Sequence, residues 1–231
     1  MRHTTERRLS DPAMARSDKK RTAILDAARE LFLRDGFEAA SMEAVTARAG
    51  VSKATVYSHF PTKHALFAAV IQAQCAGLVP TVEDAFVDEA PPAAALTRIG
   101  EAFLDMLMTQ APLALYRVVV AEAPRQPDLG RAFYEGGPLR LSSALARYLA
   151  EAAARGQVAI DEPQLAAEQF LGMLVGHHHL RMLFGIRSAP FSAAERRRLV
   201  RSAVARFLGT DPAPARAPRR RAEPPASRPA A

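Results

Sequence analysis

The chain is poor in cysteine and in aromatic residues, and it lacks tryptophan. Its 231 residues include one cysteine, Cys75, and 6% aromatic side chains. A single cysteine excludes an intramolecular disulfide framework, as is typical of proteins in a reducing cytoplasm. No apolar run reaches the roughly 18 residues that a transmembrane helix needs, and residues 1–21 lack the apolar core of a signal peptide. We therefore expect a cytoplasmic protein without a membrane partner.

The abundant residues favour helices. Nearly half of the chain is apolar (49%), which is enough for a sizeable core. Ala, Leu, Arg and Glu outnumber Val, Ile, Thr and Tyr, and this order follows helix propensity. The composition therefore predicts an all-α fold, either as one large helical domain or as a small domain joined to a larger one.

Positive charge is concentrated at the two ends of the chain. The net charge is +7, with 12 Lys and Arg against 8 Asp and Glu in residues 1–80. Residues 81–208 are balanced at 14 of each sign, and residues 209–231 carry 5 Arg and 2 acids. A basic first third followed by a neutral segment predicts a module that binds polyanions, attached to a part of the chain with another role. A basic surface that serves only solubility is the alternative.

Apolar periodicity and capping residues divide the chain into four parts. We expect a flexible arm at 1–17, a small helical domain at 18–79, a larger one at 80–209 and a disordered basic Pro/Ala/Arg tail at 210–231. The predicted helices start near residues 19, 42, 53, 63, 92, 112, 138, 163 and 192, with a short additional helix at 129–134. Gly36 is expected to end the first of them.

The segment 41–60 carries the strongest functional signal. Ser41 and Ser52 can each cap a short helix, and Gly50 ends the first of the two. Two short helices separated by a tight turn form a helix-turn-helix, whose second helix enters the major groove of DNA. With the apolar residues 51, 56 and 60 turned inward, the side chains left to face DNA are Lys53, Thr55, Tyr57, Ser58 and His59.

Several short sequence segments between Thr22 and Ile71 together match the pattern of one protein family. They are Ile24–Ala28, Leu31-Phe32, Gly36-Phe37, Ala49–Tyr57, Phe60, Lys63 and Leu66-Phe67. Together they resemble the DNA-binding domain of the TetR family of transcriptional regulators. Residues 92–208 more loosely resemble the C-terminal regulatory domain of AefR-like members, through Tyr116–Glu122, Pro127–Leu129 and Phe133-Tyr134.

The resemblance implies a nine-helix architecture, in which a three-helix helix-turn-helix domain precedes a larger ligand-binding and dimerisation domain. It implies a bacterial homodimer that pairs through its last two long helices, binds double-stranded operator DNA and joins the nucleoid when DNA-bound. An effector pocket among the fifth to eighth helices would control the separation of the two DNA-binding domains. The implied function is a repressor released by a small-molecule effector, and an activator of the same family is the alternative.

The resemblance also places DNA contacts. The expected DNA-binding residues are Ser41, Thr46, Lys53, Thr55, Tyr57, His59 and Lys63. Of these, Lys53 and Thr55 are expected at base edges, whereas Tyr57, His59 and Lys63 are expected at phosphates. Each contact has a structural alternative, which is packing for Tyr57, a helix-terminal role for Thr55 and a solvated helix start for Lys63.

The expected effector pocket has few polar groups. Its candidate residues are Phe103, Leu107, Tyr116, Met173 and His177. Their low polarity indicates a hydrophobic or aromatic effector.

Three consecutive histidines, His177–His179, suggest a metal site at first sight. Neighbours on a helix project about 100° apart and cannot converge on one ion, and the i, i+4 spacing of helical metal ligands is missing. We therefore expect no metal, no cofactor and no catalytic site. A helical metal-dependent enzyme is the alternative from another class, and a protein-interaction module that does not touch DNA is a third.

Overall fold

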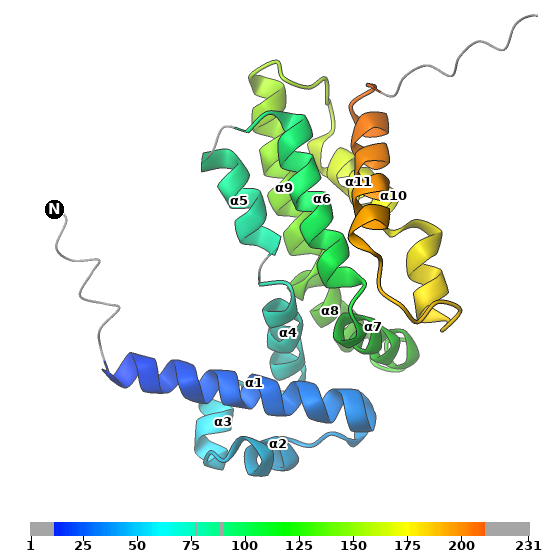
Figure 1. Ribbon diagram of the computed structural model, residues 1–231. Helices are drawn as coiled ribbons and strands as arrows, with labels where there is room; N and C mark the ends of the chain where they lie inside the picture. The colour runs from blue at the N-terminus through cyan, green and yellow to red at the C-terminus, as the bar shows by residue number, and fades with distance from the viewer. Residues whose placement is uncertain (1–11, 77, 88–89, 211–231) are drawn as a thin grey trace, which may run out of the picture.

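The computed structural model describes residues 12–76, 78–87 and 90–210, and every regular element in these ranges is a helix. The all-α prediction is confirmed. Figure 1 shows a small N-terminal layer joined to a larger helical body. Eleven helices are assigned in the described ranges, because the predicted short helix after Gln126 counts separately and one helix was not predicted. The predicted tail at 211–231 lies outside the described residues.

The first four helices form the small N-terminal layer, which we call the head. Their bounds are Pro12–Ala39 for α1, Met42–Ala49 for α2, Lys53–His59 for α3 and Lys63–Gln74 for α4. In Figure 1, α1 lies across α2 and α3, and α4 rises from this layer to the body. The three predicted caps form, because Ser41, Ser52 and Thr62 accept hydrogen bonds from backbone amides three residues further on.

Helix α1 begins earlier than the sequence predicted. It begins at Pro12, so residues 12–17 of the expected flexible arm are helical, and residues 1–11 lie outside the described part. Proline suits the first turn of a helix because no donor is lost there. The regular helix breaks at Gly36, as predicted, because its φ of 80° and ψ of 173° are not helical, and a short helical segment after this kink extends the range of α1 to Ala39.

Three phenylalanine rings fill the centre of the head. Phe32, Phe37 and Phe67 are fully buried. The Phe32 ring centroid lies 5.6 Å from that of Phe37 and 5.2 Å from that of Phe67. The first pair is stacked and the second meets edge to face, and contacts of both kinds add to the free energy of burying the rings. They tie α1 to α4, which leads to the body.

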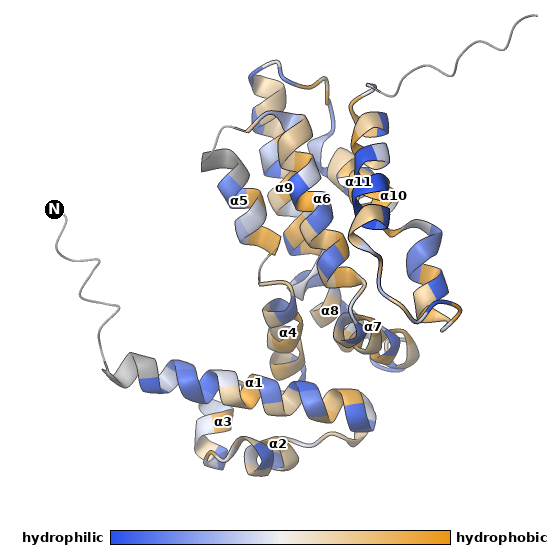
Figure 2. Ribbon diagram, in the orientation of Figure 1, coloured by the Kyte–Doolittle hydropathy of each residue, from blue (hydrophilic) through white to orange (hydrophobic). Residues whose placement is uncertain are grey.

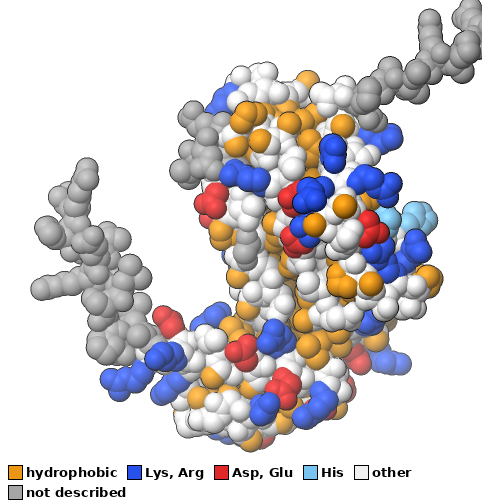
Figure 3. Space-filling view, in the orientation of Figure 1, with side chains coloured by type: hydrophobic (Ala, Val, Ile, Leu, Met, Phe, Trp, Pro, Cys, Tyr) orange, Lys and Arg blue, Asp and Glu red, His pale blue; other side chains and the backbone are white. Residues whose placement is uncertain are grey.

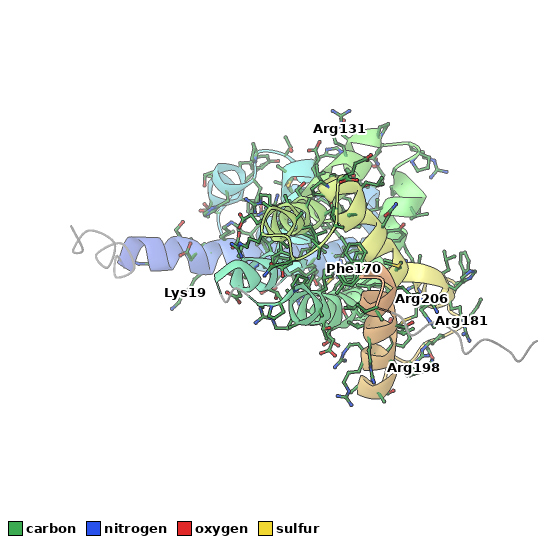
Figure 4. All side chains as sticks on the ribbon, turned by 90° about the horizontal axis from the view of Figure 1, so that it is seen from above. Lys19, Arg131, Phe170, Arg181, Arg198 and Arg206 are labelled. Carbon is green, nitrogen blue, oxygen red and sulfur yellow. The ribbon has the colours of Figure 1, made fainter. Side chains whose placement is uncertain are left out.

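The body contains the remaining seven helices. Their bounds are Leu78–Val87 for α5, Pro92–Leu107 for α6, Gln110–Glu122 for α7, Pro127–Gly136 for α8, Pro138–Ala154 for α9, Pro163–Leu183 for α10 and Ala193–Phe207 for α11. Figure 2 shows orange, hydrophobic residues along these helices, with blue residues alternating on their outer faces. Seen from above in Figure 4, Phe170 of α10 lies inside the bundle, whereas Arg181, Arg198 and Arg206 extend outward.

Helix α5 is the helix that the sequence did not predict. Pro80 lies in its first turn, where proline is tolerated. Leu78 and Val82 are buried and pack into the body core. The burial of these side chains against α6 and α9 therefore stabilises a helix for which the sequence has no clear local signal.

Helices α7 and α8 connect the two cores. Leu115 and Val119 of α7 and Leu129 of α8 are buried in the core of the head, whereas Leu113 of α7 belongs to the core of the body. Gln126, just before α8, donates a hydrogen bond of 2.5 Å to the Glu38 carboxylate of α1. The head is thus packed against the body through α7 and α8 as well as joined to it through α4.

No single helix in the described ranges is both long and apolar enough to cross a membrane. Two bent pairs, α4 with α5 and α6 with α7, pass that test on length and composition.

Candidate nucleic-acid interface and ligand cavity

The helix-turn-helix is held by the inner side of α3. Val56 is fully buried and Phe60 is 4% exposed, while the Arg21 guanidinium of α1 lies 5.6 Å above the Phe60 ring. Lys53 and Tyr57, the first and fifth residues of α3, remain exposed on the opposite side. The geometry therefore presents α3 as a surface helix fixed from behind, as a recognition helix must be.

Lys53 is the exposed cation at the start of α3. Its Nζ lies 2.7 Å from the Glu43 carboxylate of α2 and 5.7 Å above the Tyr57 ring. The hydrogen bond with Glu43 raises the pKa of Lys53 and lowers the pKa of Glu43. Both side chains are well exposed, so this ion pair is weak and can be exchanged for a DNA group at small cost.

The remaining predicted contact residues differ in accessibility. Ser41 is exposed, whereas Thr46, Thr55 and His59 are half-buried. The Thr46 hydroxyl donates to the Met42 carbonyl oxygen at 2.8 Å. The Thr55 hydroxyl lies 2.9 Å from that of Ser52. The structure thus brings all four side chains to the α2–α3 region, and the hydroxyl groups of Ser41, Thr46 and Thr55 are already hydrogen-bonded within the head.

Lys63 differs from the other predicted DNA contacts. Its Nζ donates a hydrogen bond of 2.9 Å to the Glu38 carbonyl oxygen and lies 4.6 Å above the Phe37 ring. The side chain is half-buried. These contacts secure the end of α1 beyond Gly36. Lys63 therefore has a structural role that differs from the solvated helix start stated as its alternative.

We expect Lys63→Met to lower the stability of the head by ~0.5–1.5 kcal/mol, because one hydrogen bond to a backbone carbonyl is lost. The salt dependence of DNA affinity should remain unchanged. Thermal unfolding and binding across a salt series measure the two effects. In the control Lys53→Met, stability should hold and the free energy of operator binding should weaken by about 1–3 kcal/mol, as expected for a contact at a base edge. A reduced slope with unchanged stability for Lys63→Met would instead make Lys63 a phosphate contact.

A basic cleft beside α3 was missed by the sequence reasoning. Arg16 and Lys20 of α1 line it together with Thr55, Ser58 and His59 of α3. Figure 3 shows Lys and Arg side chains gathered at the N-terminal end of α1. The net positive charge of residues 1–80 was the available signal, but residue 16 was assigned to a flexible arm. Once α1 extends to Pro12, this charge is placed next to the recognition helix.

The body encloses a cavity of about 320 Å3 between α4 and α10. Three of the five predicted pocket residues line it, namely Phe103, Leu107 and Tyr116. Ile71 and Cys75 of α4 also line it. Burial raises the pKa of the Cys75 thiol, which keeps this side chain uncharged.

Two predicted pocket residues, Met173 and His177, are not in this cavity. Both are exposed, and His179 lines the cavity instead, with 5% of its surface exposed. Leu171 and Val175 are four residues apart and both line the cavity, so Met173 between them faces away from it. The backbone of α10 kinks at Gly176, whose φ of 42° and ψ of −155° are not helical, and beyond this kink His179 rather than His177 lines the cavity.

The three consecutive histidines diverge as their spacing predicted. The His178 ring meets Phe191 at 5.1 Å, and the His179 ring meets Tyr116 at 5.0 Å. His177 is exposed. Within the described ranges, no group of three or more His, Cys, Asp and Glu side chains is arranged to hold a metal ion.

Two family models match the chain, one over the head and the other over the body. The model of bacterial regulatory proteins of the tetR family matches residues 24–70, which form the head. The model of the AefR-like transcriptional repressor C-terminal domain matches residues 94–210, which form most of the body. The chain belongs to the TetR family of transcriptional regulators.

Solved structures agree over most of the chain. A TetR-family transcriptional regulator from Mesorhizobium loti is 32% identical, with a TM-score of 0.71 over 84% of this chain and 97% of that one. The flavonoid-responsive regulator FrrA is also 32% identical, with a TM-score of 0.65 over 83% of this chain and 96% of that one.

A curated relative is similar over a shorter stretch. The HTH-type transcriptional activator FasR of Mycolicibacterium smegmatis is 38% identical over 90 residues, which are 39% of this chain and 41% of FasR. The match thus spans about two fifths of the length of that relative.

Proposed function

We propose that this protein is a sequence-specific DNA-binding repressor that acts as a homodimer and leaves its operator when a small apolar or aromatic effector occupies the body cavity. The observation that carries the proposal is the position of α7. Its Leu115 lies in the cavity wall and in the core of the DNA-binding head at once. A change at the cavity is therefore one side chain away from the packing that orients α3.

DNA reading is assigned to α2, α3 and the start of α1. Lys53 and Thr55 are proposed to contact base edges, and Tyr57 and His59 phosphates, with Ser41 and Thr46 adding contacts from α2. Arg16 and Lys20, in the cleft beside α3, are proposed as further phosphate contacts. Lys and Arg at such positions add affinity that falls as salt rises.

Dimerisation is assigned to α10 and α11. Large apolar side chains remain exposed along α10 and the loop after it, namely Leu165, Met173, Leu180, Phe184 and Ile186. The capping box of Ser192 and Glu195 fixes the start of α11. Hydrogen bonds from Arg187 and Ser192 lower the Glu195 pKa to about 2, so the carboxylate stays ionised there.

We expect Leu180→Glu to weaken the dimer by about 30-fold or more, because a charge would replace an apolar anchor worth ~2 kcal/mol or more at the centre of the interface. Sedimentation equilibrium measures the effect. Val120→Glu is the matched control, since Val120 is exposed on α7 and lies outside this surface. A dimer that withstands Leu180→Glu would place the interface elsewhere.

The coupling route also includes α4. Ile71, Gln74 and Cys75 line the cavity, and the same helix packs into the head core through Leu66 and Phe67. A ligand that contacts the end of α4 can favour one orientation of the head over another only through a difference in affinity for the two states. The proposed release thus follows from direct contacts of the cavity with α4 and α7.

The test is an unbiased selection of genomic fragments by the purified full chain, followed by binding to the recovered fragment and to random DNA of equal length across a salt series. The proposal expects preference for the recovered fragment and saturation at two chains per site. Binding equal to that of random DNA would overturn it. A promoter reporter then separates repression from activation, the activity named for FasR.

A further inference from the structure

We infer that the body cavity selects an uncharged aromatic molecule that carries a hydroxyl group, and that His179 is the side chain that binds this hydroxyl. The inference rests on the proposed function, because it names the class of effector for the same cavity. It is carried by four features of the cavity wall, which are its charge, its rings, its unpaired nitrogen and its opening.

The wall contains no cation among the described residues. No Lys or Arg lines the cavity, and Glu168 is the one acidic side chain among its lining residues. Glu168 lies exposed at the rim, where it accepts a hydrogen bond of 2.8 Å from Gln164. A carboxylate or phosphate ligand would lose its hydration without gaining a positive partner. The cavity is therefore suited to a neutral molecule.

Aromatic rings form one side of the wall. The Tyr116 ring meets Phe133 at 5.7 Å and His179 at 5.0 Å, and both pairs are T-shaped. Phe103 also lines the cavity. A flat aromatic ligand can join such a cluster through further edge-to-face contacts.

His179 supplies the unpaired polar group. In the described part of the chain, three buried side-chain nitrogens lack a hydrogen-bond partner, and that of His179, Nε2, is the one that belongs to the cavity wall. Burial lowers the pKa of His179, so its imidazole is neutral at neutral pH. A neutral imidazole can exchange a hydrogen bond with a hydroxyl group.

The other buried polar group of the wall is already satisfied. The Ser142 hydroxyl donates to the Leu139 carbonyl oxygen at 3.2 Å and accepts from Gln164 at 3.1 Å. Buried polar groups are rarely left unpaired without a functional reason. A ligand hydroxyl that reaches His179 would give its Nε2 atom the missing hydrogen-bond partner. An apolar ligand of the same shape cannot do this.

Gly172 of α10 lines the cavity together with Glu168. It is exposed, and a Cβ atom at this position would meet no heavy atom within 4 Å. We place the entrance to the cavity at this position, where the absence of a side chain leaves open space. A large side chain at residue 172 is expected to close this entrance.

Three probes of matched shape test the inference by equilibrium dialysis with the full chain at neutral pH. They are 4-hydroxybiphenyl, biphenyl and biphenyl-4-carboxylate. We expect 4-hydroxybiphenyl to bind about 10-fold more tightly than biphenyl, as one buried hydrogen bond allows, and the carboxylate to bind most weakly. Gly172→Phe should weaken binding of all three probes, whereas Gly172→Ala should not.

Two substitutions of His179 give the specific readout. His179→Phe keeps a ring beside Tyr116 and should make 4-hydroxybiphenyl and biphenyl bind equally. His179→Gln keeps a hydrogen-bonding group and should retain the preference. The inference is overturned by a preference that survives in His179→Phe, by tightest binding of the carboxylate, or by no binding of any probe. DNA binding measured on the same samples without probe reports on the proposed function separately.

Discussion

Tyr57→Ala is expected to lower affinity for the selected operator by about 10- to 100-fold, the ~1–3 kcal/mol of one direct DNA contact. The side chain stands on the outer face of α3 and is 39% exposed. Its removal should change stability by no more than ~0.5 kcal/mol, because it leaves the head core intact. Fluorescence anisotropy with labelled operator measures the affinity, and thermal unfolding checks the stability.

Tyr57→Phe is the matched control. It keeps the ring beneath Lys53 and removes only the hydroxyl, so it separates ring contacts from a hydrogen bond to phosphate. Unchanged operator affinity for Tyr57→Ala, with the fold intact, would show that α3 does not meet DNA through this face.

Phe32→Ala is expected to cost ~3–5 kcal/mol of stability, the range for deleting a fully buried phenylalanine ring. Phe32 contacts Phe37 and Phe67, so its loss separates α1 from α4 at the centre of the head. Operator binding should fall with the folded fraction. Denaturant unfolding of the full chain, followed by circular dichroism, measures the loss.

Phe32→Leu provides a graded comparison, because it retains most of the apolar volume and should cost clearly less than alanine. A loss below ~1 kcal/mol for Phe32→Ala would mean that the three-ring cluster is not the centre of the head.

Local signals were sufficient for the helix-turn-helix. Capping by Ser41 and Ser52 and the left-handed Gly50, with φ 64°, depend on residues only a few positions apart, so the sequence predicted α2 and α3 with their correct bounds. The outward position of Lys53 and Tyr57 followed from helix periodicity once Val56 was turned inward.

Contacts between segments far apart in the sequence could not be predicted from such local signals. The hydrogen bond from Lys63 to Glu38 depends on α1 continuing past Gly36, which spacing alone does not reveal. Helix α5 forms because Leu78 and Val82 find a buried site on the body, despite Pro80. In both places, packing partners far along the chain decide the outcome.

The cavity shows how the facing of one helix changes a functional assignment. Phe103, Leu107 and Tyr116 line the cavity as expected from the apolar stripes of α6 and α7, and their contact with an effector stays a prediction. Helix α10 is apolar on more than one side and kinks at Gly176, so its sequence did not show which side faces the cavity. The choice of Met173 and His177 over His179 followed from that ambiguity.

The most direct test of a ligand-responsive DNA-binding protein is to measure operator affinity with and without saturating 4-hydroxybiphenyl, and probe affinity with and without saturating operator. We expect the probe to weaken operator binding by at least about 5-fold and the operator to weaken probe binding by the same factor, because the coupling between two sites is reciprocal. Gly172→Phe, with its entrance closed, should bind operator with an affinity that the probe does not change. Tight binding of the probe to native protein whose operator affinity stays constant would contradict the coupling of the cavity to α3.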